Sequence, residues 1–299
     1  MRVKHSGNWK RIDKVFIRHN GVWKQVNKLF HKVNGVWKEG WNNAIEVPAS
    51  SIPNRNINFN LFTHVGSPNE PVQVVFDSGN NKEFLSDNVN TPAFNVGNFV
   101  NGSEIIITFG TGTIVAGRGG DGGLGTQSED HSGTNPQNGG TGFHTTRACK
   151  VTNNGQIAGG GGGGGRGGSR TTYNCSGSGG GGAGGWHNAT TPLANGTGKD
   201  SQTIPSGYGG IGAGEQHDRN NSPRAGDGNL TTGGPFSNSS NNGTDRGGKG
   251  GDLGQAGEQG YGSTHNQGPS GGGSAGNAVK GNNLITWVTL GTITGNRVN

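Results

Sequence analysis

The residues of this chain that could do chemistry are few and lie far apart. The segment GGGGGGGRGGS at 159–169 resembles a phosphate-binding loop only superficially, because it lacks the Lys-Ser/Thr pair that reaches phosphate and magnesium. The segment GGKGGDLGQ at 247–255 comes near a calcium-binding repeat, but it occurs once and such sites need stacked tandem copies. We therefore expect no nucleotide site, no metal site and no cofactor.

Catalysis has little support from the ionisable residues. The nine histidines show no metal-ligand spacing, and acids such as Glu129, Asp130, Glu215 and Asp218 are interpreted as solvated loop residues. A carboxylate pair assembled from two loops, as in a glycosidase, stays open because its geometry is not visible in a sequence. The sequence predicts no catalytic residue and a protein that is not an enzyme.

The segments between glycine tracts carry the strongest functional signal. They combine small polar residues with isolated aromatic residues, arginines and histidines, which is the composition of an adaptable recognition surface. Ordinary surface loops are the alternative interpretation. The candidate receptor-binding residues are Phe143, His144, Arg170, Tyr173, Trp186, His187, His217, Arg219, Phe236 and His265.

Glycine recurs at every third position over much of the chain after residue 110. A three-residue period fits neither an α-helix nor a β-strand but the polyproline-II type of helix, in which glycine on one stripe lets backbones pack together. A flexible linker is a poor alternative because the spacing is regular, and collagen is another because only 11 prolines are present. The predicted structural glycines are Gly159, Gly162, Gly165, Gly168, Gly179, Gly182, Gly185, Gly248, Gly251, Gly254, Gly257 and Gly260.

The first 41 residues contain an internal repeat. GNWK at 7–10, GVWK at 21–24 and GVWK at 35–38 are spaced 14 residues apart, and the segments between them end in Asn-Gly. Asn-Gly between β-favouring runs predicts hairpins around Asn20-Gly21 and Asn34-Gly35. Repeated tryptophans suit docking to a protein better than stacking on nucleic acid. The predicted attachment residues are Trp9, Phe16, Trp23, Phe30, Trp37 and Trp41.

The predicted fold is all-β and irregular, with little or no α-helix, in three parts. Residues 1–44 form the hairpin segment. Residues 45–110 form a small antiparallel β-domain, because runs such as VQVVF and EIIITF alternate with turn residues. Residues 111–299 form a sandwich of polyglycine-II helices with long recognition loops and a C-terminal strand.

Charge and cysteine content restrict the class of protein further. The first 50 residues hold 10 of the 24 Lys/Arg residues, whereas the remainder is nearly neutral. No apolar signal peptide or membrane span is apparent, so we expect synthesis in a host cytoplasm. Cys149 and Cys175 flank the longest glycine run, and whether they form a disulfide stays open.

The order of the glycine motifs resembles a known family, the tip adhesins of T-even-type phage long tail fibres. The resemblance rests on GTGTIVAGRGGDGG at 110–123, GQIAGGGGGGGRGG at 155–168 and the final LITWVTLGTITGNRVN, and it covers about residues 105–299. It implies one adhesin at the distal tip of a trimeric tail fibre of the virion. It also implies variable loops that bind a porin-like outer-membrane protein, or lipopolysaccharide, of a Gram-negative host, and a role in assembling the distal fibre.

The Gly-x-Trp-Lys repeat departs from that family pattern and looks like segments of other phage tail proteins. Our hypothesis is that the three tryptophan units engage a three-fold fibre end, one adhesin per fibre trimer and without nucleic acid. Two alternatives remain for the whole chain. One is a glycine-helix structural or ice-binding protein, although its unequal loops do not form a flat array. The other is a depolymerase of surface polysaccharide.

Overall fold

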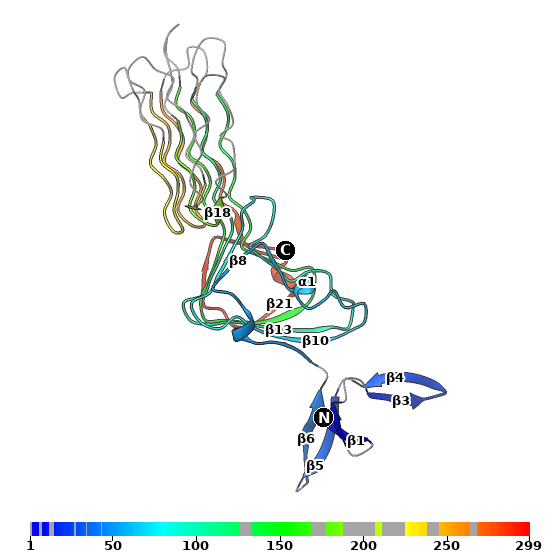
Figure 1. Cartoon of the computed structure of the whole chain (residues 1–299). Helices are drawn as coiled ribbons and strands as arrows, with labels where there is room; N and C mark the ends of the chain where they lie inside the picture. Colours follow the sequence, from blue (N-terminus) through cyan, green and yellow to red (C-terminus); the bar gives the residue numbers. More distant parts are fainter. Residues whose placement is uncertain are drawn as a thin grey trace.

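The residues that the structure describes fold into three regions that are nearly free of α-helix (Figure 1). The computed structural model describes residues 2–5, 8–11, 15–26, 28–33, 35–42, 44–125, 133–168, 178–187, 207–210, 225–237, 245–262 and 268–299. Among these residues, the only helices are α1 (Leu61–His64) and the short 3-10 turns η1 (Ala49–Ser51) and η2 (Asn282–Leu284). No helix in the described ranges is long and apolar enough to cross a membrane. The expected mostly-β fold is confirmed.

The N-terminal region consists of three antiparallel hairpins, each a separate two-stranded sheet. In the second hairpin, His19 pairs with Val22 across Asn20 and Gly21, whose φ angles are 49° and 81°. Positive φ at both turn residues is the type I′ geometry that matches strand twist, so the hairpin at Asn20-Gly21 is confirmed. The strands are β1 (Arg2–His5), β2 (Asn8–Arg11), β3 (Val15–His19), β4 (Val22–Val26), β5 (Lys28–Val33) and β6 (Val36–Asn42).

The central region is a prism of three five-stranded parallel sheets. The first sheet has the order β21 (Ile285–Thr289), β16 (Cys149–Asn153), β13 (Glu104–Phe109), β10 (Gln73–Asp77), β7 (Ile45–Val47). The second has the order β22 (Thr292–Thr294), β17 (Gln156–Ala158), β14 (Ile114–Ala116), β11 (Glu83–Leu85), β8 (Arg55–Ile57). The third has the order β23 (Asn296–Val298), β20 (Asn277–Lys280), β15 (Phe143–His144), β12 (Phe94–Asn95), β9 (Phe59–Asn60).

The predicted antiparallel domain at 45–110 is therefore wrong in its strand direction. The chain visits the three sheets in turn, so each strand pairs with the strand one full coil later, as Val74 of β10 pairs in parallel with Ile45 and Ile105. The turn residues lie at the corners of the prism, where the chain continues forward instead of reversing. Strands on both sides of residue 110 belong to the same three sheets, so the division predicted there does not separate them.

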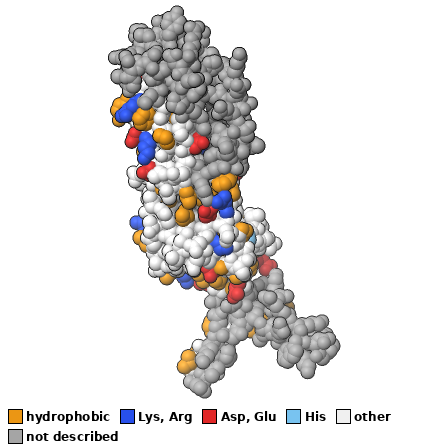
Figure 2. Space-filling model, turned by 60° about the vertical axis from the view of Figure 1, so that its left-hand side comes forward, with side chains coloured by type: hydrophobic (Ala, Val, Ile, Leu, Met, Phe, Trp, Pro, Cys, Tyr) orange, Lys and Arg blue, Asp and Glu red, His pale blue; other side chains and the backbone are white. Residues whose placement is uncertain are grey.

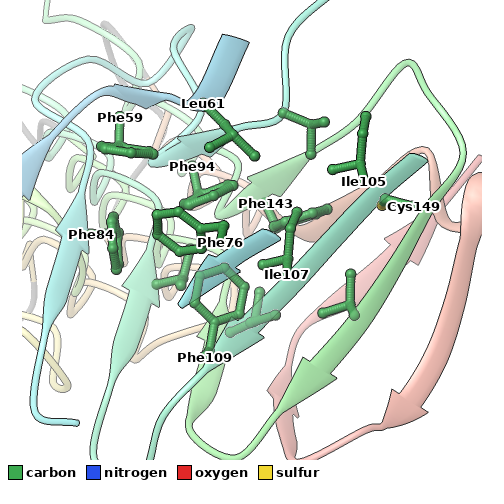
Figure 3. Packing of buried hydrophobic residues seen from close by; sticks show 14 of the residues in the cluster. Phe59, Leu61, Phe76, Phe84, Phe94, Ile105, Ile107, Phe109, Phe143 and Cys149 are labelled. Atoms are coloured by element: carbon green, nitrogen blue, oxygen red, sulfur yellow. The ribbon is translucent and has the colours of Figure 1, made fainter. Parts of the chain in front are cut away.

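Phenylalanine fills the interior of the prism (Figure 3). Phe94 pairs with Phe59 on one side and Phe143 on the other, and its ring centroid lies 5.1 Å and 5.5 Å from theirs. Phe76 and Phe109 approach the same ring edge-on. Because a parallel coil places equivalent residues directly above one another, one aromatic position repeated per coil produces a continuous stack.

Cys149 is a free thiol buried in this prism. Cys175 lies outside the described residues, so the question of a disulfide between the two cysteines stays open. Burial raises the pKa of the Cys149 thiol from 9.0 to about 12, and a hydrogen bond with Thr145 opposes the rise only in part. A raised pKa favours the protonated thiol in the folded state. Its contribution to stability is therefore complete below about pH 9 and is lost as the pH rises toward 12.

We expect iodoacetamide to leave Cys149 unmodified in the folded protein near neutral pH, because the thiolate is the reactive form. Peptide mass spectrometry, which reports Cys149 and Cys175 separately, measures this after alkylation with and without denaturant. Equal rates of Cys149 alkylation in the two conditions would contradict the buried placement.

The glycine region is inserted into the prism at a single corner. The chain leaves the second sheet after β14 and returns at β15, and one coil later it leaves after β17 and returns at β20. The glycine segments of both insertions run side by side away from the sheets (Figure 1). Beside the prism, β18 (Trp186–His187) pairs with β19 (Gly207–Tyr208), and the Arg55 guanidinium lies 4.4 Å from the Trp186 ring centroid.

Candidate functional site: the far end of the glycine bundle

The segment 159–165 is the central helix of the glycine bundle, because it has six hydrogen-bonded neighbours. Its N–H groups donate in a period of three, Gly160 and Gly163 to residues 140 and 137, Gly161 and Gly164 to 183 and 180, and Gly162 and Gly165 to 255 and 258. Its carbonyls accept with the same period from residues 276 and 273, 120 and 123, and 251 and 248. Backbone pairing thus replaces an apolar core, and the polyglycine-II arrangement is present.

Glycine is required wherever this bundle brings two backbones together. A Cβ on Gly162 would overlap the carbonyl of Gly273, and one on Gly161 would overlap the carbonyl of Gly251. Most of the predicted structural glycines have this environment, with a neighbouring carbonyl in the place of a Cβ. They are Gly159, Gly162, Gly165, Gly179, Gly182, Gly185, Gly248, Gly251, Gly257 and Gly260.

The run GGKGGDLGQAGEQGYG forms two helices rather than one. Gln255 N–H donates to Asp252, Glu258 N–H to Lys249, and Tyr261 N–H to Arg246, so the chain folds back on itself. Gly254 lies in the turn with a φ of 67°, outside the helical stripe. The three-residue spacing of glycine continues across the chain reversal because both helices pack against backbone neighbours. This spacing therefore does not mark the turn.

Serine hydroxyls hold the described helix ends together at the end of the bundle away from the prism. Ser178 Oγ accepts a hydrogen bond from the N–H of Gly125 at 3.1 Å, and Ser237 Oγ accepts one from Ser178 N–H at 2.8 Å. Ser270 Oγ accepts from Arg166 N–H at 2.9 Å. These side chains satisfy backbone donors at the positions where the described helices stop, so several chain ends are fixed close to one another.

An arginine held between two aromatic rings lies at this end. The Arg246 guanidinium carbon is 4.9 Å from the centroid of Phe236 and 4.5 Å from that of Tyr261. Tyr261 is 49% exposed, and the other two side chains are half-buried. On the face drawn in Figure 2, charged and hydrophobic side chains are scattered over the described part of the bundle, among backbone and other side chains. We call these three residues the Arg246 cluster, and its composition is that of a binding hot spot.

The structure assigns different places to the predicted receptor-binding residues. Phe143 is wrong as a contact residue, because it lies in β15 with its ring fully buried in the prism. His144, beside it, is a strand residue, and burial followed by the charge of Lys280 lowers its pKa. Trp186 is half-buried beside Arg55, and the side chain of His187 is not described. Arg170, Tyr173, His217, Arg219 and His265 lie outside the described residues.

Only Phe236 of the predicted set belongs to the Arg246 cluster. Sequence analysis missed Arg246 and Tyr261 because both lie at the edges of glycine tracts that were assigned a structural role. Arg246 precedes Gly247 and Tyr261 lies between Gly260 and Gly262, but no pattern in the sequence marks the two as neighbours. The described residues contain no group of three histidine, cysteine, aspartate or glutamate side chains that could hold a metal ion.

The predicted attachment residues lie on the hairpins. Trp23 and Trp37 are each 66% exposed, and Phe16 and Phe30 are half exposed. Trp9 and Trp41 occupy paired strand positions, opposite Lys4 and Leu29, and their side chains are not described.

Comparison with known proteins gives one family. The model of the phage tail fibre adhesin Gp38 matches residues 44–298, which leaves the three hairpins outside it. A search of curated proteins finds no significant match. Among solved structures, the crystal structure of the gp37–gp38 adhesin tip complex of the bacteriophage S16 long tail fiber matches with a TM-score of 0.43 and 22% identity, over 85% of this chain and 81% of that one. The family is one of adhesins rather than of enzymes, and this chain belongs to the phage tail fibre adhesin Gp38 family.

Proposed function

We propose that this adhesin stands at the distal tip of a tail fibre and binds an outer-membrane protein of a Gram-negative host through the far end of its glycine bundle. The observation that carries the proposal is the convergence of the described helix ends there, where serine hydroxyls fix them and the Arg246 cluster is presented. Segments attached to a stiff scaffold can vary in sequence without disturbing it, as recognition loops require.

The bundle suits this role because its packing uses backbone rather than side chains. Neighbouring helices meet through N–H and carbonyl groups, so side chains at the far end are free for contact with a receptor. Arginine and tyrosine dominate binding energy at protein interfaces. Arg246, already flanked by two rings, would lose little side-chain freedom on binding, which favours affinity.

Binding of the purified full chain to bacteria tests the proposal. Labelled protein is mixed with host cells, with mutants that each lack one outer-membrane protein, and with mutants whose lipopolysaccharide is truncated. Loss of binding on one protein deletion supports the proposal and names the receptor. Loss only with truncated lipopolysaccharide would replace the protein receptor by a glycan, and release of soluble sugar would indicate a depolymerase.

We expect Tyr261→Ala to weaken binding to cells by roughly tenfold or more, because truncating an interface aromatic costs about 2 kcal/mol. Val288→Ala is the matched control, since Val288 is also exposed, at 64%, but lies in β21 of the prism. Cell-binding titrations of both variants measure the effect. Equal affinities for the two variants would remove Tyr261 from the receptor surface.

A further inference from the structure

The three N-terminal hairpins each carry a basic residue opposite a tryptophan at the same register position. Across the strands, Lys4 lies opposite Trp9, Arg18 opposite Trp23 and Lys32 opposite Trp37. Each pair is two positions from the turn, on equivalent faces of the three hairpins. One basic residue and one tryptophan therefore form a unit that occurs three times in one chain.

The tryptophan face of this unit is exposed where its side chains are described. Trp23 and Trp37 are each 66% exposed, and Phe16 and Phe30 extend the same face at 50% and 54%. The Lys32 Nζ lies 5.9 Å from the Trp37 ring centroid, and Arg18 Nε donates to the carbonyl of Gly21 at 3.3 Å. A flat aromatic surface next to a positively charged side chain fits an apolar pocket that is bordered by acidic residues.

Each hairpin contributes little stability of its own. Each is a separate two-stranded sheet, and an isolated two-stranded hairpin is marginally stable in water. The hairpin segment also carries the positive charge of the chain, with 10 of its 24 Lys/Arg residues. Each hairpin is basic, carries exposed aromatic side chains and is only marginally stable by itself. An acidic surface that covers the tryptophan face would stabilise it best.

The connections between the hairpins restrict how far apart their binding sites can lie. Val26 ends β4 and Lys28 begins β5, so two residue steps, about 7 Å at full extension, separate them. Four steps, about 14 Å, separate Arg11 at the end of β2 from Val15 at the start of β3. The three modules therefore start near one point, which suits three sites grouped around a common axis.

We propose that the three hairpins occupy three equivalent acidic sites around the axis of a homotrimer, the end of the tail fibre. Three identical sites around one axis are what a homotrimer supplies, and three copies of one module let a single chain match them. The inference rests on the proposed function only in placing the adhesin on a fibre. It assigns the attachment to residues that precede the family-matched region, which begins at 44.

Because the three hairpins are connected in one chain, three weak binding contacts together give high overall affinity. When one hairpin is bound, its short connection holds the next hairpin at a high effective concentration near the second site. Binding at the second and third sites is then intramolecular and loses little further translational entropy. Loss of one module should therefore weaken attachment by about tenfold to a hundredfold, whereas loss of all three should abolish it.

The test uses the full chain and adhesin-free tail fibres purified from the same phage and immobilised. The variants are Trp23→Ala, Trp37→Ala and the triple change that includes Trp9→Ala. Matched controls are Val22→Ala and Val36→Ala, at positions 59% and 60% exposed that alternate with the tryptophans and so point to the opposite face. The charge reversal Lys32→Glu leaves every tryptophan in place. A loss of binding in this variant therefore cannot result from misfolding caused by removal of a tryptophan.

The expected result is a graded loss of affinity with the tryptophan changes, a loss with Lys32→Glu, and wild-type binding by the valine variants. Binding should weaken between about 0.1 M and about 0.5 M salt. The complex should contain one 30.5 kDa adhesin per three fibre chains. Wild-type binding by the triple variant, equal losses in the valine controls, or three adhesins per trimer would overturn the proposal.

Cell binding separates this inference from the proposed function. The triple variant should still bind bacteria as the wild-type chain does, because its glycine bundle is unchanged. If the wild-type chain bound fibres in the tryptophan-dependent way but bound no cells, the receptor proposal would fail and the attachment would stand.

Discussion

Gly162→Ala is expected to be among the most damaging single substitutions in this chain, although it adds one methyl group. The new Cβ would occupy the position of the Gly273 carbonyl, so the central helix and its neighbour would have to separate. Separation breaks the N–H to carbonyl bonds that run in both directions along segment 159–165. Overpacking combined with buried unpaired backbone groups costs at least about 3 kcal/mol.

Thermal unfolding of the full chain measures this effect, with an expected fall in the melting temperature of about 10 °C or an insoluble product. Gly271→Ala is the matched control, because a Cβ there meets no atom within 4 Å although the residue belongs to the same bundle. Its stability should change by no more than about 0.5 kcal/mol. Similar melting temperatures for the two variants would mean that the glycine stripe is not in close contact.

Phe94→Ala should destabilise the prism by about 3–5 kcal/mol, the range for truncating a buried aromatic side chain. Phe94 is fully buried, and its ring contacts five others. The cavity would lie between coils, where parallel strands on both sides fix the spacing and restrict collapse. The rings around it belong to Phe59, Phe76, Phe84, Phe109 and Phe143.

Denaturant unfolding gives the magnitude, with two reference variants. Phe94→Leu retains much of the buried volume and should lose roughly a third to a half as much stability. Val288→Ala removes an exposed side chain from β21 and should change stability by less than about 0.5 kcal/mol. A loss below about 1 kcal/mol for Phe94→Ala would be inconsistent with a continuous aromatic stack.

The elements with a local physical cause could be predicted from the sequence. The Asn20-Gly21 hairpin follows from the positive φ that both residues tolerate, and the glycine helices follow from the three-residue period. Strand direction could not be predicted, since a run such as VQVVF looks the same in a hairpin and in a coil. What decides it is the pairing of Val74 with Ile45 and Ile105, which is not local.

The candidate site was predicted less well than the fold, for a related reason. The sequence predicts Phe143 in a recognition segment between glycine tracts, yet its position opposite Phe94, one coil earlier, places it in the core. Arg246 and Tyr261 come together because the chain reverses at 252–254, and no periodicity in the sequence marks that reversal. Side chains that meet across such a turn can be found only in three dimensions.

The pairing around segment 159–165 has a mechanical consequence. With a receptor bound at the far end of the bundle, as proposed above, a virion would pull along the axes of the glycine helices. The hydrogen bonds of segment 159–165 lie across those axes, toward six neighbours. Bonds in that orientation are sheared together and share the force, whereas the bonds of a hairpin pulled at its open end break one after another. Under the proposed function, the bundle would therefore act as a stiff rod that transmits this pull to the prism.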